Sequence, residues 1–206
     1  MSAPTHELVG LTGFAGSGKN AAADVLVAAH RFTQDSFALT LKKFAYDVDP
    51  FVQVDDGSFV RYAQLVDAVG VDIAKKNADV RRLLQRIGTD GGRHNIHQDV
   101  WVDATMARIA SAAGPVVITD VRFPNEVDAL RRAGGLLIRI DRPGYGPVNG
   151  HSSDTGITAL DVDQVIVNDG TITQLQRRLT NLLGLTGGSA DRVDRNPNHQ
   201  FDPVHD

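Results

Sequence analysis

The chain has 206 residues, of which 42% are hydrophobic and 22% are charged. These proportions are ordinary for a folded domain and exclude a largely disordered chain, a fibre and a coiled coil. There are 21 Lys and Arg residues and 25 Asp and Glu residues, which gives a formal net charge of −4. The chain therefore lacks the basic excess of proteins that bind duplex nucleic acid, and we expect no direct nucleic-acid binding.

The sequence contains no cysteine. This excludes disulfides, Cys-ligated zinc, iron–sulfur clusters and a cysteine nucleophile. No apolar run approaches the ~18 residues that a membrane-spanning helix requires. The segment 1–7 lacks the basic region and the long apolar core of a secretory signal. We expect a cytoplasmic protein without membrane contact.

Short apolar runs alternate with helical periodicities along the chain. In chain order we expect a strand at 8–13, a helix at 19–30, a strand at 32–38, helices within 39–68 around a loop at 47–58, helices at 79–88 and 101–113, a strand at 116–120, a helix at 124–133, strands at 136–140 and 165–167, and a helix at 171–183. Buried strands that alternate with helices indicate an α/β fold with a parallel sheet. The final stretch, 186–206, is polar and is expected to be a poorly packed tail.

A glycine-rich motif lies between the first strand and the first helix. It reads G-x-x-x-x-G-K, the P-loop pattern, in which glycines let the backbone wrap around phosphates and the lysine holds the β- and γ-phosphates. The residues expected to bind ATP are Gly13, Gly16, Ser17, Gly18, Lys19 and Asn20. Asn20 stands where a Ser or Thr hydroxyl normally binds Mg²⁺, and its amide oxygen would hold the ion or its water more weakly. The alternative is a glycine-rich turn that binds nothing.

Three residues near a later strand are further candidates. Asp120 ends an apolar strand, where an acid could hold Mg²⁺ through water or bind a substrate hydroxyl. Arg122 lies two residues on and points to the same side if the strand continues. Glu126 falls in the first turn of the next helix. The alternatives are an ion pair between Asp120 and Arg122 and a helix-dipole contact for Glu126.

Arginines supply candidate phosphate ligands. Arg82 and Arg86 are four residues apart and project from one face of the expected helix. Phosphoryl transfer needs cations around the migrating group, and Lys42 and Arg142 are further candidates. The alternative for these side chains is a solvated surface.

The only tryptophan, Trp101, could stack on a base or could belong to the core. His151 and Asp154 follow a glycine-rich stretch. They could belong to a lid that carries polar groups over an active site, or to a solvated loop.

These motifs, in this order, resemble the deoxynucleoside monophosphate kinases of tailed bacteriophages. The segments that carry the resemblance are 13–20, 80–90, 101–102, 119–122 with Glu126, 142–144, 151–156 and 168–170. It implies a P-loop NTPase three-layer fold, with a central, mostly parallel sheet flanked by helices. It implies transfer of the γ-phosphoryl group of Mg²⁺-ATP to a deoxynucleoside 5′-monophosphate, in phage nucleotide supply within the host cytoplasm. Small kinases of this kind often form homodimers.

The resemblance also implies roles for individual residues. Gly18, Lys19 and Asn20 would contact the phosphates of ATP. The residues that would line the monophosphate pocket are Arg82, Gly88, Trp101, Asp120, Arg122 and Glu126. Lys19, Arg82, Asp120 and Arg122 would act on the transferring group, with Arg86 or Arg142 as helpers.

The expected domain organisation follows from the same resemblance. Residues 1–185 would form the kinase domain, with a monophosphate-binding helical insert at about 40–113 and a lid at about 142–157. Two alternatives stay open. A dephospho-coenzyme A kinase or another small-molecule kinase would share the P-loop and an arginine-rich helix. A P-loop ATPase or switch would act through a partner, although no guanine-reading Asn-Lys-x-Asp motif is present.

Overall fold

The computed structural model describes residues 7–146 and 161–185. These residues form two compact units, one made of the chain up to Phe37 and from Val102 onward, the other of Ala38–Trp101. His151, Asp154 and the rest of the expected lid beyond residue 146 lie outside the described residues, as does the tail at 186–206. No helix in the described part of the chain has the length and apolar character needed to cross a membrane.

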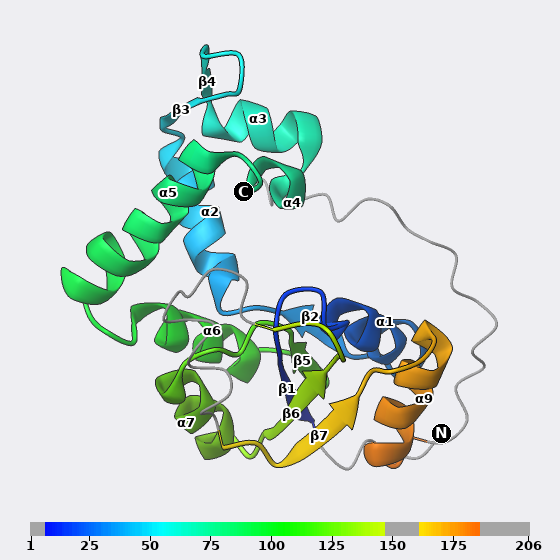
Figure 1. Ribbon diagram of the computed structural model, residues 1–206. Coiled ribbons are helices and arrows are strands. Elements are labelled where there is room, and N and C mark those ends of the chain that lie inside the picture. The colour runs from blue at the N-terminus through cyan, green and yellow to red at the C-terminus, as the bar shows by residue number, and fades with distance from the viewer. Residues whose placement is uncertain (1–6, 147–160, 186–206) are drawn as a thin grey trace. The chain divides into compact units, whose positions relative to one another are not determined.

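A five-stranded sheet forms the centre of the first unit (Figure 1). Its strands are β1 (Leu8–Thr12), β2 (Thr33–Asp35), β5 (Val116–Ile118), β6 (Leu136–Asp141) and β7 (Gln164–Val167). They are ordered β2-β5-β1-β6-β7, and every neighbouring pair is parallel. The five predicted strands are confirmed. β2 ends earlier than predicted because the Ser36 amide donates to the Asp35 carboxylate (2.6 Å) and the Phe37 amide donates to Asp120 (2.8 Å).

Helices cover both faces of this sheet, as Figure 1 shows. α1 (Lys19–His30) and α9 (Ile172–Leu182) pack on one face, and α6 (Val100–Ala110) and α7 (Pro124–Arg132) pack on the other. Successive side chains of β1 point to opposite faces, so Val9 and Leu11 contact the first pair of helices while Leu8 contacts the second. The predicted three-layer α/β fold is confirmed.

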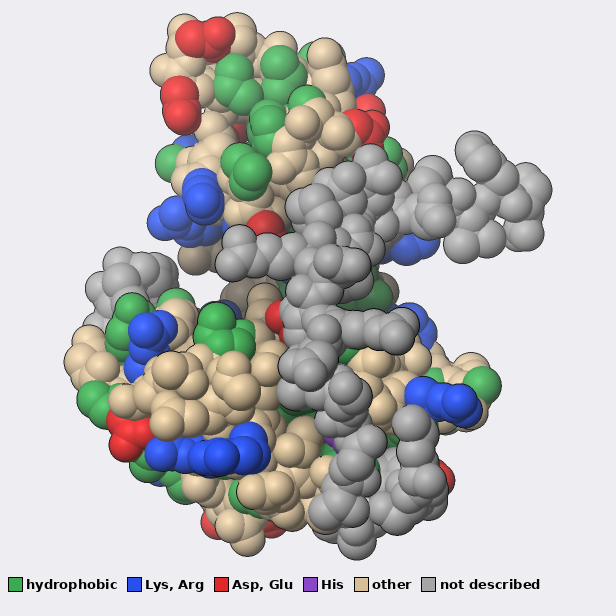
Figure 2. Space-filling model, turned by 90° about the vertical axis from the view of Figure 1, so that its right-hand side faces the viewer, with side chains coloured by type: hydrophobic (Ala, Val, Ile, Leu, Met, Phe, Trp, Pro, Cys, Tyr) green, Lys and Arg blue, Asp and Glu red, His purple; other side chains and the backbone are tan. Residues whose placement is uncertain are grey.

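The second unit has a core of its own. Its elements are α2 (Ala38–Val48), the antiparallel hairpin of β3 (Phe51–Gln53) and β4 (Phe59–Arg61), α3 (Tyr62–Val69), α4 (Val71–Ala74), α5 (Ala78–Gln85) and the π-helical segment η1 (Arg86–His94). The buried core residues are Ala45, Val52, Tyr62, Val66, Ala74 and Val80. So small a core leaves apolar side chains such as Phe51, Phe59 and Ile73 exposed, and Figure 2 shows hydrophobic side chains at the surface of this unit among charged ones.

The predicted helix at 79–88 begins at Ala78 and continues to His94 through η1. A π-helical segment leaves carbonyl groups outside the regular α-helical ladder, and the Gly88 carbonyl accepts a hydrogen bond from Trp101 Nε1 (2.9 Å). A Cβ atom on Gly92 would lie 2.6 Å from the indole, so glycine is required where the tryptophan packs. The compact unit ends at Trp101, and from Val102 onward α6 packs on the sheet of the first unit.

Candidate functional site

The turn between β1 and α1 has the backbone of a P-loop. Gly13, Gly16 and Gly18 have φ angles of +138°, +78° and +105°, which side-chain-bearing residues rarely adopt. A Cβ atom on Gly13 would collide with the carbonyl oxygen of Ile140, and one on Gly18 would lie 2.7 Å from Asn168 Nδ2. The turn therefore requires glycine at these positions for both conformation and space.

The ammonium group of Lys19 is held at this turn. Its Nζ atom donates to the carbonyl oxygens of Gly13 (2.7 Å) and Phe14 (2.9 Å). Lys19 is also the first residue of α1, so the cation and the helix N-terminus lie together. Both favour a bound anion.

The loop contains polar groups suited to a phosphate. Gly18 is the N-cap of α1 and has no side chain to accept from the first amides of the helix. The hydroxyls of Thr12 and Ser17 are buried and have no hydrogen-bond partner among the described residues. A helix N-terminus without a side-chain cap and two unpartnered hydroxyls around a positively charged side chain fit a phosphate chain such as that of ATP.

Two residues from other strands support the loop. Arg142, which follows β6, donates to the Gly16 carbonyl (3.1 Å), and its guanidinium lies 4.5 Å from the centre of the Tyr145 ring. Asn168, which follows β7, donates to the Ser17 carbonyl (2.8 Å). The segment 168–170 carries part of the family resemblance, but the sequence predicts no role for Asn168. Its position directly after a buried strand was the available signal, because the carboxyl ends of parallel strands share one edge.

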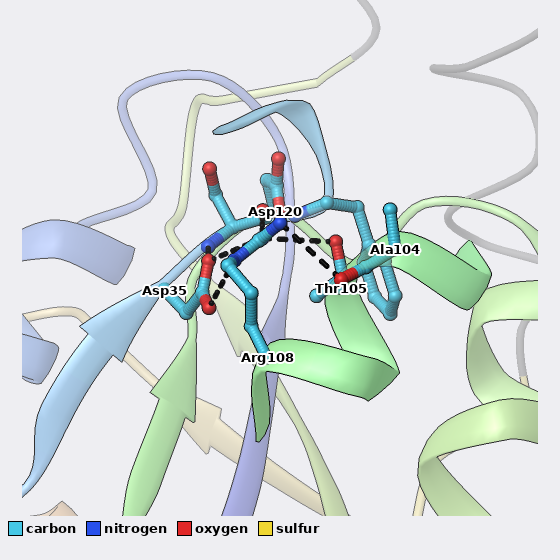
Figure 3. A network of polar contacts seen from close by, with 7 residues as sticks. Asp35, Ala104, Thr105, Arg108 and Asp120 are labelled. Atoms are coloured by element: carbon cyan, nitrogen blue, oxygen red, sulfur yellow. Dashed lines mark hydrogen bonds and ion pairs between the residues drawn. The ribbon is translucent and has the colours of Figure 1, made fainter. Parts of the chain in front are cut away.

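Asp120 lies in a polar network at that edge (Figure 3). Its Oδ1 atom accepts from the Phe37 amide (2.8 Å), just beyond β2. In the same view Arg108 of α6 holds the Asp35 carboxylate through Nε (3.1 Å) and Nη2 (2.8 Å). Arg108 also donates to the Ser36 carbonyl (3.3 Å) and to the Thr105 hydroxyl (3.1 Å). Sequence reasoning missed the Asp35–Arg108 pair, because no local pattern links residues 73 positions apart.

Glu126 is buried and has the contacts of a helix cap. Its Oε2 atom accepts from the amides of Arg122 (2.7 Å) and Phe123 (3.1 Å). These contacts fix the backbone at Arg122, whose own side chain is exposed. The contacts of Glu126 place its carboxylate at the helix N-terminus, as in the alternative that the sequence offers. A role of Arg122 or Glu126 in binding the acceptor stays a prediction.

A cavity of about 500 Å³ lies within the second unit. Arg82 and Arg86 both line it, as their spacing predicts. The other lining residues are Phe51, Val52, Asp79, Leu83, Ile87, Asp90, Gly91 and Asn95. Arg82 forms an ion pair with Asp79 through Nη2. Charged, polar and aromatic groups around a space of this size are suited to a small phosphorylated ligand.

Three other predicted residues of this unit do not line that cavity. Trp101 is only 7% exposed and packs at an angle on Phe44, with ring centres 6.4 Å apart. Gly88 is buried against Leu41 and accepts the tryptophan hydrogen bond. Lys42 lies on α2 and does not line the cavity. Trp101 is therefore a core residue, which is the second of the two roles that the sequence leaves open for it.

Few side chains of the described residues are placed to bind a metal ion. Within residues 7–146 and 161–185, no cluster of three or more His, Asp or Glu side chains is placed to hold a metal ion. Asn20 is exposed in the first turn of α1, next to Lys19. A magnesium ion that binds with ATP takes most of its ligands from phosphates and water, so the donor set fits such an ion.

Several proteins similar to this chain are named as deoxynucleotide monophosphate kinases. A family model described as deoxynucleotide monophosphate kinase matches residues 48–179. A putative deoxynucleotide monophosphate kinase of Acanthamoeba polyphaga mimivirus is 32% identical over 194 residues, which cover 84% of this chain and 93% of that protein. The deoxynucleotide monophosphate kinase of Enterobacteria phage T4 is 30% identical over 141 residues, which cover 65% of this chain and 58% of that protein.

A solved structure, the dephospho-CoA kinase from Campylobacter jejuni, aligns with a TM-score of 0.46 at 11% identity, over 86% of this chain and 96% of that one.

The Asp35–Arg108 pair allows a stability test. We expect Asp35→Ala to lower the free energy of unfolding by about 1–3 kcal/mol, because it leaves the partly buried guanidinium of Arg108 without its carboxylate. Urea denaturation of the purified full chain measures the change. The matched control is Asp161→Ala, which removes a carboxylate that is 85% exposed and paired with Arg131, and should cost about 0–1 kcal/mol. Equal losses in both variants would contradict a structural role for the buried pair.

Proposed function

Because the chain belongs to the deoxynucleotide monophosphate kinase family, we propose that it transfers the γ-phosphoryl group of ATP to deoxynucleoside 5′-monophosphates and releases ADP. The observation that carries the proposal is the P-loop, in which glycine conformations, an uncapped helix N-terminus and the Lys19 ammonium coincide. The phage and mimivirus relatives favour a role in nucleotide supply for DNA synthesis in the host cytoplasm.

The reaction needs no general base from the protein. The second pKa of a phosphate monoester is about 6, so the attacking oxygen is mostly deprotonated near neutral pH. Catalysis then comes from alignment of the two phosphates and from neutralisation of their charge. Lys19 supplies this charge at the ATP phosphates, and Arg142 is a second cation at the same loop.

Mg²⁺ would bind together with ATP, with Asn20 and Asp120 as the residues that hold the ion or its water. When bound, it would neutralise charge on the β- and γ-phosphates. Asp120 would serve this role with a carboxylate whose position is fixed by the hydrogen bond that Oδ1 accepts from the Phe37 amide.

The acceptor phosphate would bind to Arg82 and Arg86, whose side chains line one cavity. Trp101 would support this site through the Gly88 carbonyl, and Glu126 would support Arg122 through its backbone amide. The other acceptor candidates from the sequence are Lys42, Gly88, Asp120, Arg122, Arg142, His151 and Asp154. A homodimer is part of the same proposal.

A coupled assay for ADP release tests the reaction. Mg²⁺-ATP is supplied with dAMP, dCMP, dGMP or dTMP, with the four ribonucleotides, or with dephospho-CoA. We expect release that depends on one or more of the deoxynucleotides. Release with dephospho-CoA alone would replace the proposed acceptor, and ATP binding without acceptor-dependent release would favour a partner-driven ATPase.

Lys19→Ala tests the P-loop. We expect kcat to fall by about 10²–10³-fold, the loss typical of removing one group that stabilises transition-state charge, while circular dichroism shows an unchanged fold. The control Lys75→Ala removes an exposed lysine paired with Asp72 and should leave kcat unchanged. A Lys19 variant with normal turnover would refute the assignment.

Arg82→Ala tests the acceptor site. A charge-assisted hydrogen bond contributes about 1.5–3 kcal/mol, so the KM for the deoxynucleoside monophosphate should rise by about 10- to 100-fold while the KM for ATP stays the same. The neighbouring Arg81, which does not line the cavity, provides the control Arg81→Ala. If both KM values rose together, Arg82 would not be an acceptor ligand.

A further inference from the structure

The two carboxylate oxygens of Asp79 contact different parts of the second unit. Oδ2 accepts from the amide of Gln53 in β3 (2.8 Å). Oδ1 forms the ion pair with Nη2 of Arg82, three residues further along α5. The Asp79 side chain is 20% exposed, whereas the Arg82 side chain is 70% exposed. A partly buried carboxylate thus connects the β3–β4 hairpin to an arginine that reaches into the cavity.

Asp79 is not needed to cap α5. The N-cap is Asn77, whose side chain accepts from the amides of Asp79 (2.9 Å) and Val80 (3.1 Å). The helix N-terminus is therefore satisfied without the Asp79 carboxylate, which is left for the hairpin and Arg82. Its charge still interacts favourably with the helix dipole, but that interaction requires neither of the two contacts.

The ion pair holds Arg82 without using all of its donors. A guanidinium has five N–H groups, and only Nη2 contacts Asp79. Nε and Nη1 of Arg82 have no other partner in the part of the chain that the structure describes. An exposed arginine loses rotamer freedom when it binds a ligand. An arginine already fixed by a carboxylate loses less of it, and its remaining donors keep one direction.

We propose that Asp79 is a positioning residue for Arg82, through which the β3–β4 hairpin sets the direction in which this guanidinium receives an acceptor phosphate. The proposal rests on the role of Arg82 in the proposed function. It predicts the direction in which phosphate affinity changes when Asp79 loses its charge. Replacing Asp79 by Asn removes a negative charge from the cavity, which by electrostatics alone would strengthen binding of a phosphate. Loss of the fixed direction of Arg82 instead weakens phosphate binding.

A double-mutant cycle tests this proposal. Binding of dAMP, dCMP, dGMP and dTMP to the full chain is measured by calorimetry for the unmodified protein, Asp79→Asn, Arg82→Ala and the double variant. We expect Asp79→Asn to weaken binding of the preferred monophosphate by about threefold or more, and to have no further effect when Arg82 is already Ala. Asp79→Glu, which keeps the charge, should bind more tightly than Asp79→Asn.

The matched control is Asp72→Asn. Asp72 of α4 pairs with Lys75, the residue that follows this helix, across the same i, i+3 spacing. Both side chains are exposed, and neither lines the cavity. The Asp72→Asn variant should bind monophosphates with the same affinity as the unmodified chain. Thermal melts of every variant establish that each is folded.

Unchanged or tighter binding by Asp79→Asn overturns the proposal, as does the same weakening in the Arg82→Ala background. The cycle also separates this proposal from the proposed function. If the chain binds monophosphates but the assay finds no acceptor-dependent ADP release, the kinase reaction fails while the cycle still decides the role of Asp79. If the unmodified chain binds none of the four monophosphates, both proposals are wrong.

Discussion

At the carboxyl end of β1 the chain turns back into α1 with backbone angles that glycine alone adopts readily. The space for this turn is set by β6, whose Ile140 carbonyl oxygen leaves no room for a Cβ atom on Gly13. The parallel pairing of β1 with β6 fixes that approach, so the sheet and the loop cannot change independently. The same turn leaves the N-terminus of α1 uncapped and next to Lys19. The anion site is therefore a consequence of how the sheet is built.

Polar side chains at the carboxyl edge of the sheet hold the surrounding backbone. Asp120 fixes the amide of Phe37, Asn168 holds the Ser17 carbonyl, and Arg142 holds the Gly16 carbonyl. These three residues follow different strands, and together they support the P-loop and the segment beyond β2. A kinase that relies on alignment rather than on a general base depends on such rigidity, because small displacements of the reacting groups slow the transfer.

Sequence patterns predicted most of the first unit, because its buried strands and amphipathic helices have strong periodicities. The hairpin of β3 and β4 was not predicted. Each of its strands has only three residues, and their sequences, Phe-Val-Gln and Phe-Val-Arg, do not alternate between apolar and polar residues. A single tryptophan could not be assigned to the core or to a ligand until Gly88 and Gly92 were placed against it. The Asp79–Gln53 and Asp35–Arg108 contacts join distant segments, and no local pattern records them. The spacing of Arg82 and Arg86 predicts that both project from one helix face, and both line the same cavity.

The proposed function is one chemical event, the direct passage of a phosphoryl group from ATP to a monophosphate acceptor. The most direct measurement follows that group itself, with ATP radiolabelled at the γ position and the products separated by chromatography after incubation with Mg²⁺ and each deoxynucleoside monophosphate. If transfer is direct, the label moves into a deoxynucleoside diphosphate and little inorganic phosphate forms. Label that appears only as inorganic phosphate, at a rate independent of the acceptor, would contradict direct transfer.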